Sequence, residues 1–257
     1  MTETGIMTSR MYKTVKTMII TGIFLTLSAC ASQTTLESGI KSANVDPLEP
    51  ANRKVYAFND GLDRILVKPL AKGYAALTPD MMQTGITNFF DNLGYLNVIV
   101  NSSLQGKLDQ SLSDIFRFLF NSTLGVAGLF DVATPMGLVA HEEDLGQTFA
   151  VWGSGQGAYL TVPIFGPNTI RDAPDLVTRW LLDPVNYLAT AVSLPATALY
   201  VINLRANLLD ATHVVDDAAL DPYSFVRDSY LQRRNYLIFD GSPPTDSNDD
   251  IFGDGNL

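Results

Sequence analysis

Residues 52–66 read NRKVYAFNDGLDRIL, and this stretch decides the fold class. Its apolar side chains recur three and four residues apart, which places them on one face of an α-helix. Pro69 follows and predicts a kink or the end of this helix, because proline has no N–H to donate within a helix. The stretch therefore predicts an amphipathic helix, with an apolar face formed by Val55, Phe58, Leu62, Ile65 and Leu66.

Three further helices follow from similar patterns. A second helix is predicted from Thr78-Pro79 through Ile99, because a cap residue before a proline marks a helix start. Gly94 is expected to interrupt this helix. A third opens near Asp109 with a wide apolar face and ends by residue 125. A last helix fits residues 222–239.

Strand-like alternation is weak throughout the chain. The best segment is residues 159–164, YLTVPI, and Pro163 limits it to a sheet edge or an extended loop. The sequence contains no internal repeat. We therefore predict an all-α fold of amphipathic and kinked helices joined by extended loops.

Two segments are unusually poor in charge. Residues 118–140 contain one charged residue, Asp131, and residues 184–204 contain none. Glycine, proline and polar residues dilute both segments, so neither resembles a lone transmembrane helix. A buried core is the simpler interpretation. The alternative is partial immersion in a membrane, where helices satisfy their own backbone and irregular stretches line a cavity.

The composition of the 257-residue chain narrows the class of protein. Hydrophobic residues make up 46% and charged residues 17%, against roughly 25% charged residues in a typical soluble domain. The net charge of −10 argues against binding to nucleic acid, whose phosphates would repel the chain. The single cysteine excludes an intramolecular disulfide and a multi-thiolate metal site.

That cysteine lies in a targeting segment. A basic stretch before residue 17 is followed by an apolar run over residues 18–27, which is typical of a secretory signal and too short to span a bilayer. Residues 27–30, LSAC, resemble a bacterial lipobox, in which the thiol receives a diacylglycerol and the peptide is cut before the cysteine. We predict a signal peptide over residues 1–29 and lipidation of Cys30. The alternative is an ordinary secretory signal with an unmodified cysteine.

The residues after Cys30 give the destination and the domain limits. Ala31 and Ser32 are not acidic, which is typical of lipoproteins exported to the outer membrane. Residues 30–45 are small and polar and predict a flexible tether. The helical domain is predicted over residues 46–239. Residues 240–257 carry five aspartates and no base, and predict a disordered acidic tail.

Two clusters have a catalytic appearance. Residues 141–144, HEED, lack the second histidine of a zinc-protease motif, so they form either a carboxylate metal site or, more simply, the acidic first turn of a helix. Residues 153–157, GSGQG, fit neither a nucleophile elbow nor a phosphate loop and predict a flexible turn. His213 has no nucleophile near it in sequence. We predict no catalytic residue, metal or cofactor, although catalytic triads assemble in space.

Short blocks of residues, spread over residues 46–239, resemble those of the VacJ/MlaA lipoproteins in the order in which that family carries them. One departure is Pro50-Ala51, where relatives often have glycine and an aromatic residue. The blocks are Asp46-Pro47-Leu48-Glu49, Asn52-Arg53, Phe58-Asn59, Asn88–Leu93, Val100-Asn101, Leu104–Lys107, Arg117-Phe118, Asn121–Gly125, Gly128–Asp131, His141–Asp144, Gly146–Thr148, Trp152-Gly153, Gly155, Gly157, Tyr159-Leu160, Pro163, Gly166-Pro167, Arg171-Asp172, Asp221-Pro222-Tyr223 and Arg227.

This resemblance implies a ring-like helical lipoprotein embedded in the periplasmic side of the outer membrane and associated with trimeric porins. It implies removal of mislocalised phospholipids from the outer leaflet and their transfer to a soluble periplasmic phospholipid-binding protein, which maintains lipid asymmetry. It implies no enzymatic activity.

The residues that would meet lipid phosphates are arginines, because a guanidinium binds phosphate through two hydrogen bonds. The candidates are Arg53, Arg117, Arg171 and Arg227. The alternative is that they pair with nearby acids such as Asp114, Asp172 and Asp228.

Two other functions remain open. A structural envelope lipoprotein that moves no lipid would have a closed, packed centre. A phospholipid-cleaving enzyme would need a nucleophile within hydrogen-bond reach of His141 or His213.

Overall fold

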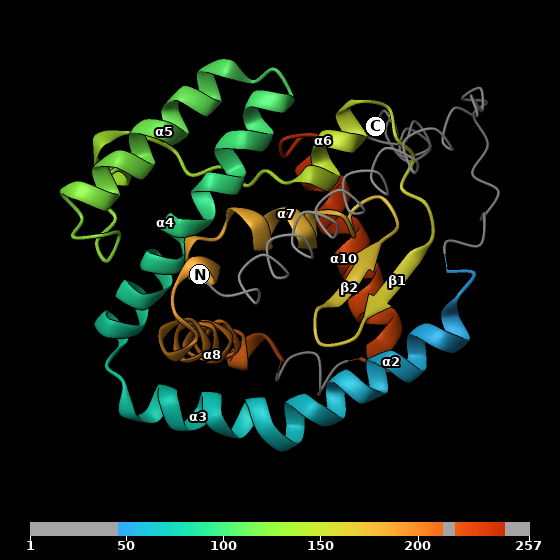
Figure 1. Cartoon of the computed structure of the whole chain (residues 1–257). Helices are drawn as coiled ribbons and strands as arrows, with labels where there is room; N and C mark the ends of the chain where they lie inside the picture. The colour runs from blue at the N-terminus through green and yellow to red at the C-terminus, as the bar shows by residue number, and fades with distance from the viewer. Residues whose placement is uncertain (1–45, 213–218, 245–257) are drawn as a thin grey trace, which may run out of the picture. The chain divides into compact units, whose positions relative to one another are not determined.

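The computed structural model describes residues 46–212 and 219–244 (Figure 1). The all-α prediction is confirmed, because helices dominate and one small sheet accompanies them. The predicted signal peptide, Cys30, the tether, His213 and residues 245–257 lie outside the described residues.

The first predicted helix extends further than its sequence pattern indicated. It comprises α2 (Glu49–Leu62), a π-helical stretch η1 (Asp63–Val67) and α3 (Lys68–Leu77). Pro69 lies in the first turn of α3, immediately after η1, where a missing backbone N–H is tolerated. A π-helical turn changes the hydrogen-bond spacing locally. The helical path therefore continues past the proline instead of ending at it.

The second and third predicted helices are α4 (Asp80–Leu104) and α5 (Leu108–Thr123), which pack against each other. Gly94 does not interrupt α4, contrary to the prediction. A glycine within a helix weakens it by about 1 kcal/mol, which the packing of a 25-residue helix readily offsets. The predicted end of α5 before residue 125 is confirmed.

Helix α6 (Leu145–Val151) was indicated only by the acidic residues before it, and two helices were not predicted: α7 (Asp175–Leu182) and α8 (Thr190–Asn207). The last contains Pro195 and has no clear polar face, so its apolar spacing gave no helical period. Short 3-10 turns η2 (Thr134–Met136) and η3 (Pro184–Tyr187) lie in the connections. The final helix α10 (Pro222–Ile238) begins and ends within one residue of its predicted limits.

The predicted strand is one half of a small hairpin. Strand β1 (Tyr159–Val162) pairs antiparallel with β2 (Gly166–Thr169), and Pro163 lies in the turn between them, as its missing donor requires. Asn59 of α2 holds this turn, since its side chain accepts from the N–H of Ile164 at 2.8 Å and donates to the carbonyl of Val162 at 3.0 Å.

The contacts between these elements close a circuit. Helix α2 packs on β1, β2 packs on α10, and α10 packs on α6. Helix α6 in turn contacts α4, α4 contacts α8, α8 contacts α3, and α3 continues through η1 into α2 (Figure 1). Segments far apart in the sequence are thereby held together without one central layer of apolar side chains.

Candidate functional site

The interior of the described domain is polar. Among the described residues, 21 buried side chains are polar or charged and only six are buried hydrophobic ones. In an ordinary soluble domain the buried set is mostly apolar. The six are Ala71, Tyr95, Ala133, Tyr159, Val185 and Tyr223.

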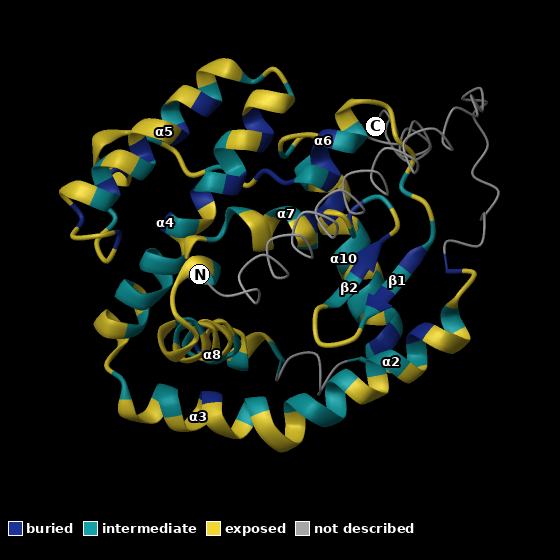
Figure 2. Ribbon diagram, viewed as in Figure 1, coloured by how far each residue is buried: buried dark blue, intermediate teal, exposed yellow. Residues whose placement is uncertain are grey.

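The exterior is correspondingly apolar. Exposed large hydrophobic side chains occur throughout both charge-poor segments, and Figure 2 shows exposed residues along most of α8. Leu194 is 65% exposed and Val139 is also 65% exposed. The buried-core interpretation of residues 118–140 and 184–204 is therefore wrong. Many large apolar side chains of these segments are exposed instead.

None of the helices in the described ranges combines the length and hydrophobicity that a membrane-crossing helix needs.

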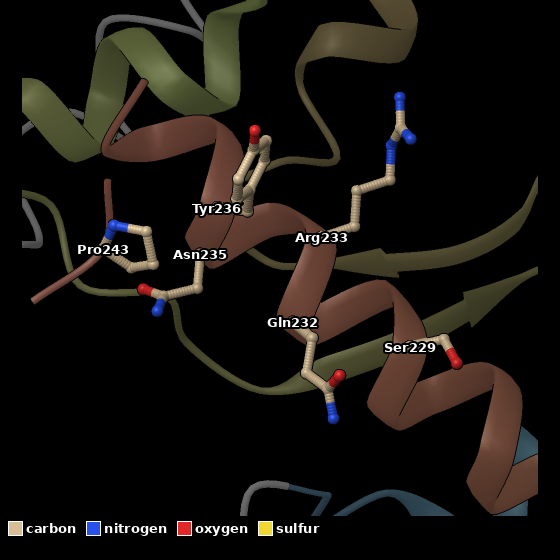
Figure 3. Close-up of a pocket in the computed structure, with 6 residues that line it drawn as sticks. All are labelled: Ser229, Gln232, Arg233, Asn235, Tyr236 and Pro243. Atoms are coloured by element: carbon tan, nitrogen blue, oxygen red, sulfur yellow. The ribbon is translucent and has the colours of Figure 1, made fainter. Parts of the chain in front are cut away.

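An open pocket of about 510 Å³ lies along α10 and the turn after it (Figure 3). Its lining offers hydroxyl, amide and guanidinium groups, but no carboxylate, imidazole or thiol. It therefore contains neither an acid–base pair nor a set of metal ligands. The lining residues are Ser229, Gln232, Arg233, Asn235, Tyr236 and Pro243.

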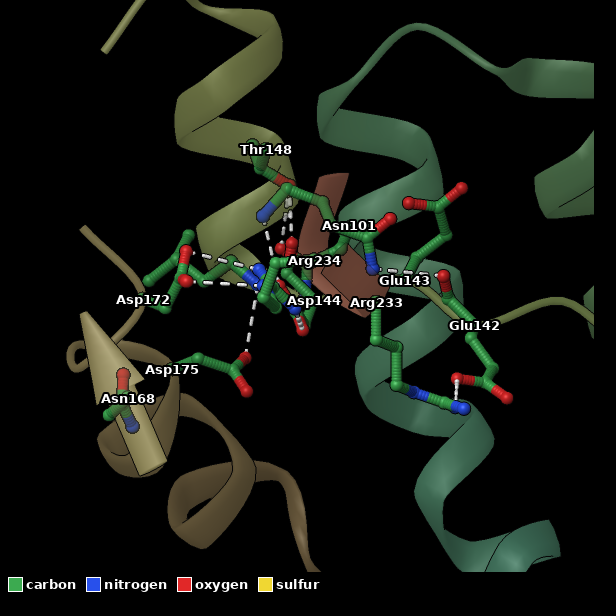
Figure 4. A network of polar contacts seen from close by, with 12 residues as sticks. Asn101, Glu142, Glu143, Asp144, Thr148, Asn168, Asp172, Asp175, Arg233 and Arg234 are labelled. Atoms are coloured by element: carbon green, nitrogen blue, oxygen red, sulfur yellow. Dashed lines mark hydrogen bonds and ion pairs between the residues drawn. The ribbon is translucent and has the colours of Figure 1, made fainter. Parts of the chain in front are cut away.

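The most extensive polar cluster surrounds Arg234 of α10, which lies between two aspartates (Figure 4). Its Nη1 and Nη2 donate to Asp144 at 2.5 and 2.9 Å, and its Nε and Nη2 donate to Asp172, each at 3.1 Å. All three side chains are buried, so the attraction acts with little screening by solvent. Arg234 thereby ties α10 to α6 and to the segment after β2.

Local sequence builds this cluster. Asp144 is the N-cap of α6, and its side chain accepts from the N–H of Gln147 at 2.9 Å. Gly146 leaves room for the cluster, because a Cβ there would lie 2.3 Å from Asp172 Oδ1 and 2.6 Å from Arg234 Nη2. A residue with any side chain at position 146 would displace the ion pairs.

The cluster extends through further ion pairs. Asp172 also accepts from Arg171 at 2.9 Å and from the hydroxyl of Tyr230 at 3.0 Å. Burial alone would raise the pKa values of Asp144 and Asp172, but the hydrogen bonds and positive charges of the arginines outweigh it and hold both below their usual value. The carboxylates are therefore held in their charged form.

The catalytic-looking residues 141–144 are dispersed among separate partners. His141 Nδ1 lies 2.8 Å from Asp114, a carboxylate rather than a nucleophile. Glu143 accepts from Lys107 at 2.8 Å, and Glu142 pairs with Arg233 at 2.6 Å. They precede α6 rather than forming its first turn, although Asp144 does act at its N-terminus. Within the described ranges, no three histidine, cysteine or acidic side chains are placed to hold a metal ion.

The glycine-rich residues 153–157 lie in the connection between α6 and β1, where a turn at residues 152–153 is followed by chain without regular secondary structure.

All four candidate arginines have acidic partners. Arg53 binds Asp221 through two hydrogen bonds, of 3.1 and 2.6 Å. Arg171 and Arg227 pair with their sequence neighbours Asp172 and Asp228, as the alternative expected. The guanidinium of Arg171 is distinctive, because its Nη2 is buried and has no hydrogen-bond partner in the described part of the chain. Contact of any of the four with phosphate stays a prediction.

Arg117 pairs with Asp131 at 2.6 Å, rather than with Asp114, and also donates to the hydroxyl of Tyr95 at 2.7 Å. Burial would raise the pKa of Asp131, but hydrogen bonds from Thr134, Arg117 and Asn121 lower it to about 2. This cluster braces the loop after α5, which lies in the first charge-poor segment.

The main cluster contains three arginines: Arg171, Arg234 and Arg179 of α7, which pairs with Asp144 at 3.3 Å. The sequence pattern offered Arg171 as a candidate and missed Arg179 and Arg234. Both lie on helices at positions that read as ordinary solvent-facing residues. Their acidic partners are between 4 and 90 positions away in sequence, so only the fold brings the cluster together. Two other residues of the cluster could have been found from the sequence. Asp144 precedes a helix, where an aspartate predicts an N-cap, and Gly146 belongs to one of the blocks that resemble the VacJ/MlaA lipoproteins.

The described domain is helical, with a polar interior and an apolar exterior, and the sequence has a lipobox-like cysteine before it. These features are those of a lipoprotein that contacts lipid. Residues 44–237 match the model of the MlaA lipoprotein family. The chain belongs to this family.

Individual relatives agree. An uncharacterised protein of Rickettsia bellii is 39% identical over 195 residues, covering 75% of this chain and 76% of the relative. The "Intermembrane phospholipid transport system lipoprotein MlaA" of Escherichia coli K12 is 34% identical over 227 residues, covering 84% and 90% respectively. A solved structure described as the "Structural basis for maintenance of bacterial outer membrane lipid asymmetry" aligns with a TM-score of 0.66 and 32% identity. It covers 75% of this chain and 98% of its own.

Proposed function

We propose that this chain removes mislocalised phospholipids from the outer leaflet of the outer membrane and passes them to a soluble periplasmic phospholipid-binding protein. The observation that carries the proposal is the inverted burial: polar side chains fill the interior and apolar ones cover the exterior. A lipid headgroup crossing an apolar layer needs a polar route, because an unpaired charge in hydrocarbon is costly. Relatives named for intermembrane phospholipid transport support the same role.

The proposed setting is the periplasmic side of the outer membrane, with the domain partly embedded and anchored through lipidated Cys30. The closed circuit of contacts among the described elements is consistent with a ring-like domain. Exposed apolar side chains on α8 and on the loop after α5 would contact acyl chains. The proposed partners are phospholipid, a trimeric porin and the periplasmic carrier, and no catalytic step is part of the proposal.

Arg53, Arg117, Arg171 and Arg227 remain proposed lipid-path residues. Arg171 has the best support, because one of its buried donors has no partner in the described residues. Substitution of each by glutamine should weaken the outer-membrane barrier if it contacts phosphate. An unchanged barrier in all four variants would dispose of this part of the proposal.

The experiment for the whole role is the phospholipid content of the outer leaflet in cells that lack the gene. Complementation should use the wild-type gene and a Cys30→Ala variant. We expect phospholipid to accumulate and only the wild-type protein to reverse it. No accumulation would contradict lipid removal and favour a structural envelope lipoprotein.

A further inference from the structure

Three arginines and three aspartates form one connected network in the interior. The pairs Arg171–Asp172, Arg234–Asp172, Arg234–Asp144, Arg179–Asp144 and Arg179–Asp175 join all six side chains. Their formal charges balance. Five of the six side chains are at most 8% exposed, whereas Arg179 is 60% exposed. Arg179 is therefore the end of the network that solvent or a ligand can reach.

The guanidinium of Arg179 is held in place by its partners. Its Nε donates to Asp175, and its Nη2 donates to Asp144 at 3.3 Å. Asp175 is fixed in turn, because it accepts from the N–H of Leu145 at 3.0 Å and from Asn97 at 3.3 Å. Nη1 of Arg179 donates no hydrogen bond to another described residue. An ordered guanidinium with an unengaged Nη1 is prepared to bind an anion, since little side-chain freedom remains to be lost.

The neighbourhood of Arg179 combines this charge with apolar side chains. Val177, Trp180 and Leu181 of the same helix are exposed. Tyr200 of α8 packs against Phe90 of α4, with ring centroids 5.0 Å apart. Burial raises the pKa of Tyr200, and the positive charge of Arg179 opposes this rise. An exposed cation on a short helix that also exposes apolar side chains suits an amphiphile better than a free inorganic anion.

We propose that Arg179 binds the phosphate of a phospholipid headgroup, while the exposed apolar side chains of the same helix contact the acyl chains. The inference rests on the proposed transport function and assigns it a binding residue. Hydrogen bonds from a guanidinium to a phosphate are charge-assisted, and Nη1 of Arg179 has two N–H donors for them. The buried acids behind it fix its position and keep the network neutral before the ligand arrives.

Another arginine of the chain serves as a matched control. Arg64 on η1 is 61% exposed and pairs with Asp60 at 3.0 Å, one helical turn away. It has nearly the same exposure as Arg179 but no place in the buried network. Loss of its charge should leave lipid affinity unchanged.

The test measures binding to the full, lipidated protein in an uncharged detergent. The probes are a short-chain phosphatidylethanolamine, a diacylglycerol with the same chains, and inorganic phosphate. We expect Arg179→Gln to weaken phosphatidylethanolamine binding at least about tenfold, as the loss of charged hydrogen bonds implies, and to leave diacylglycerol binding unchanged. Arg179→Lys should give a smaller loss, because it keeps the charge without the fork, and Arg64→Gln should match wild type.

Each outcome is decisive. Wild-type affinity for phosphatidylethanolamine in Arg179→Gln would overturn the proposal. Inorganic phosphate binding as tightly as the phospholipid would overturn the headgroup assignment in favour of a free anion. If Arg179→Gln fails to fold, judged by circular dichroism, unchanged phospholipid affinity in Arg179→Lys would overturn it instead. Failure of wild type to bind either lipid would contradict the proposed transport function itself.

Discussion

Helix α8 and the network around Arg234 have opposite relations between polarity and burial. In α8 apolar side chains face outward, and Leu194 is 65% exposed. Arg234 is 7% exposed, and five of the six charged side chains of its network are buried against their partners. The hydrophobic effect cannot stabilise this arrangement of α8 in water, because its apolar side chains are not removed from water. The comparison indicates that specific ion pairs and hydrogen bonds fix the interior, while the exterior is suited to an apolar surrounding.

The largest expected effect comes from breaking the interior network. Arg234→Ala leaves Asp144 and Asp172 buried without their shared cation, and we expect a loss of about 3–5 kcal/mol of unfolding free energy. Thermal unfolding in detergent measures it. The control is Arg233→Ala on the adjacent position, whose partner Glu142 is exposed and whose loss should cost at most about 1 kcal/mol. Equal effects would mean that the buried network does not hold the interior.

A smaller effect is expected from filling the space at Gly146. The Cβ of Gly146→Ala would meet Asp172 and Arg234 well inside normal contact distance. Adjustment of the ion pairs should lower stability by about 1–3 kcal/mol. Gly155→Ala is the control, because a Cβ there has no neighbour within 4 Å. Chemical denaturation compares the two, and a neutral Gly146→Ala would contradict tight packing of the network.

Acid should weaken the cluster at Asp131. The pKa of Asp131 is lowered to about 2 in the fold, against an unfolded value of about 3.9. Its contribution is therefore present above about pH 4 and is lost as the pH falls through about 2. Asp131→Asn should lower stability at neutral pH, and its difference from wild type should vanish near pH 2. A difference independent of pH would contradict this assignment.

The smallest effect is expected on the exterior. Leu194→Asn should change unfolding free energy by less than about 0.5 kcal/mol, because the side chain is already exposed. Val185→Asn, in η3, is the comparison: Val185 is buried, and an unpaired amide there should cost about 1–3 kcal/mol. A large loss for Leu194→Asn in detergent would show that α8 is buried after all.

The sequence predicted the helices that have a clear apolar period. Residues 52–66, the third helix and α10 were found because each carries such a period or clear end signals. Helix α8 was missed because its apolar residues surround it and Pro195 interrupts the pattern. The π-helical stretch before Pro69 depends on how the chain accommodates the proline, which spacing alone does not specify.

The site was predicted less completely. Asp144, which caps α6, and Gly146 lie in sequence blocks that resemble the family. Their partner Arg234 lies 90 residues after Asp144, so the sequence pattern does not connect them. The charge-poor segments were interpreted as core because hydrophobic residues are normally buried in water. That rule fails where the interior is polar, and no local pattern reports the polarity of the interior.

The most direct test of the inverted arrangement is the surroundings of α8 in a membrane. A spin label on Leu194→Cys should be relaxed more strongly by lipid-soluble oxygen than by a water-soluble nickel complex. A label on Ser229→Cys, beside the polar pocket of α10, should show the reverse preference. Cys30 is the only native cysteine and is expected to be lipidated, so it would not react. A label at Leu194 that prefers the nickel complex would contradict an apolar exterior in contact with lipid.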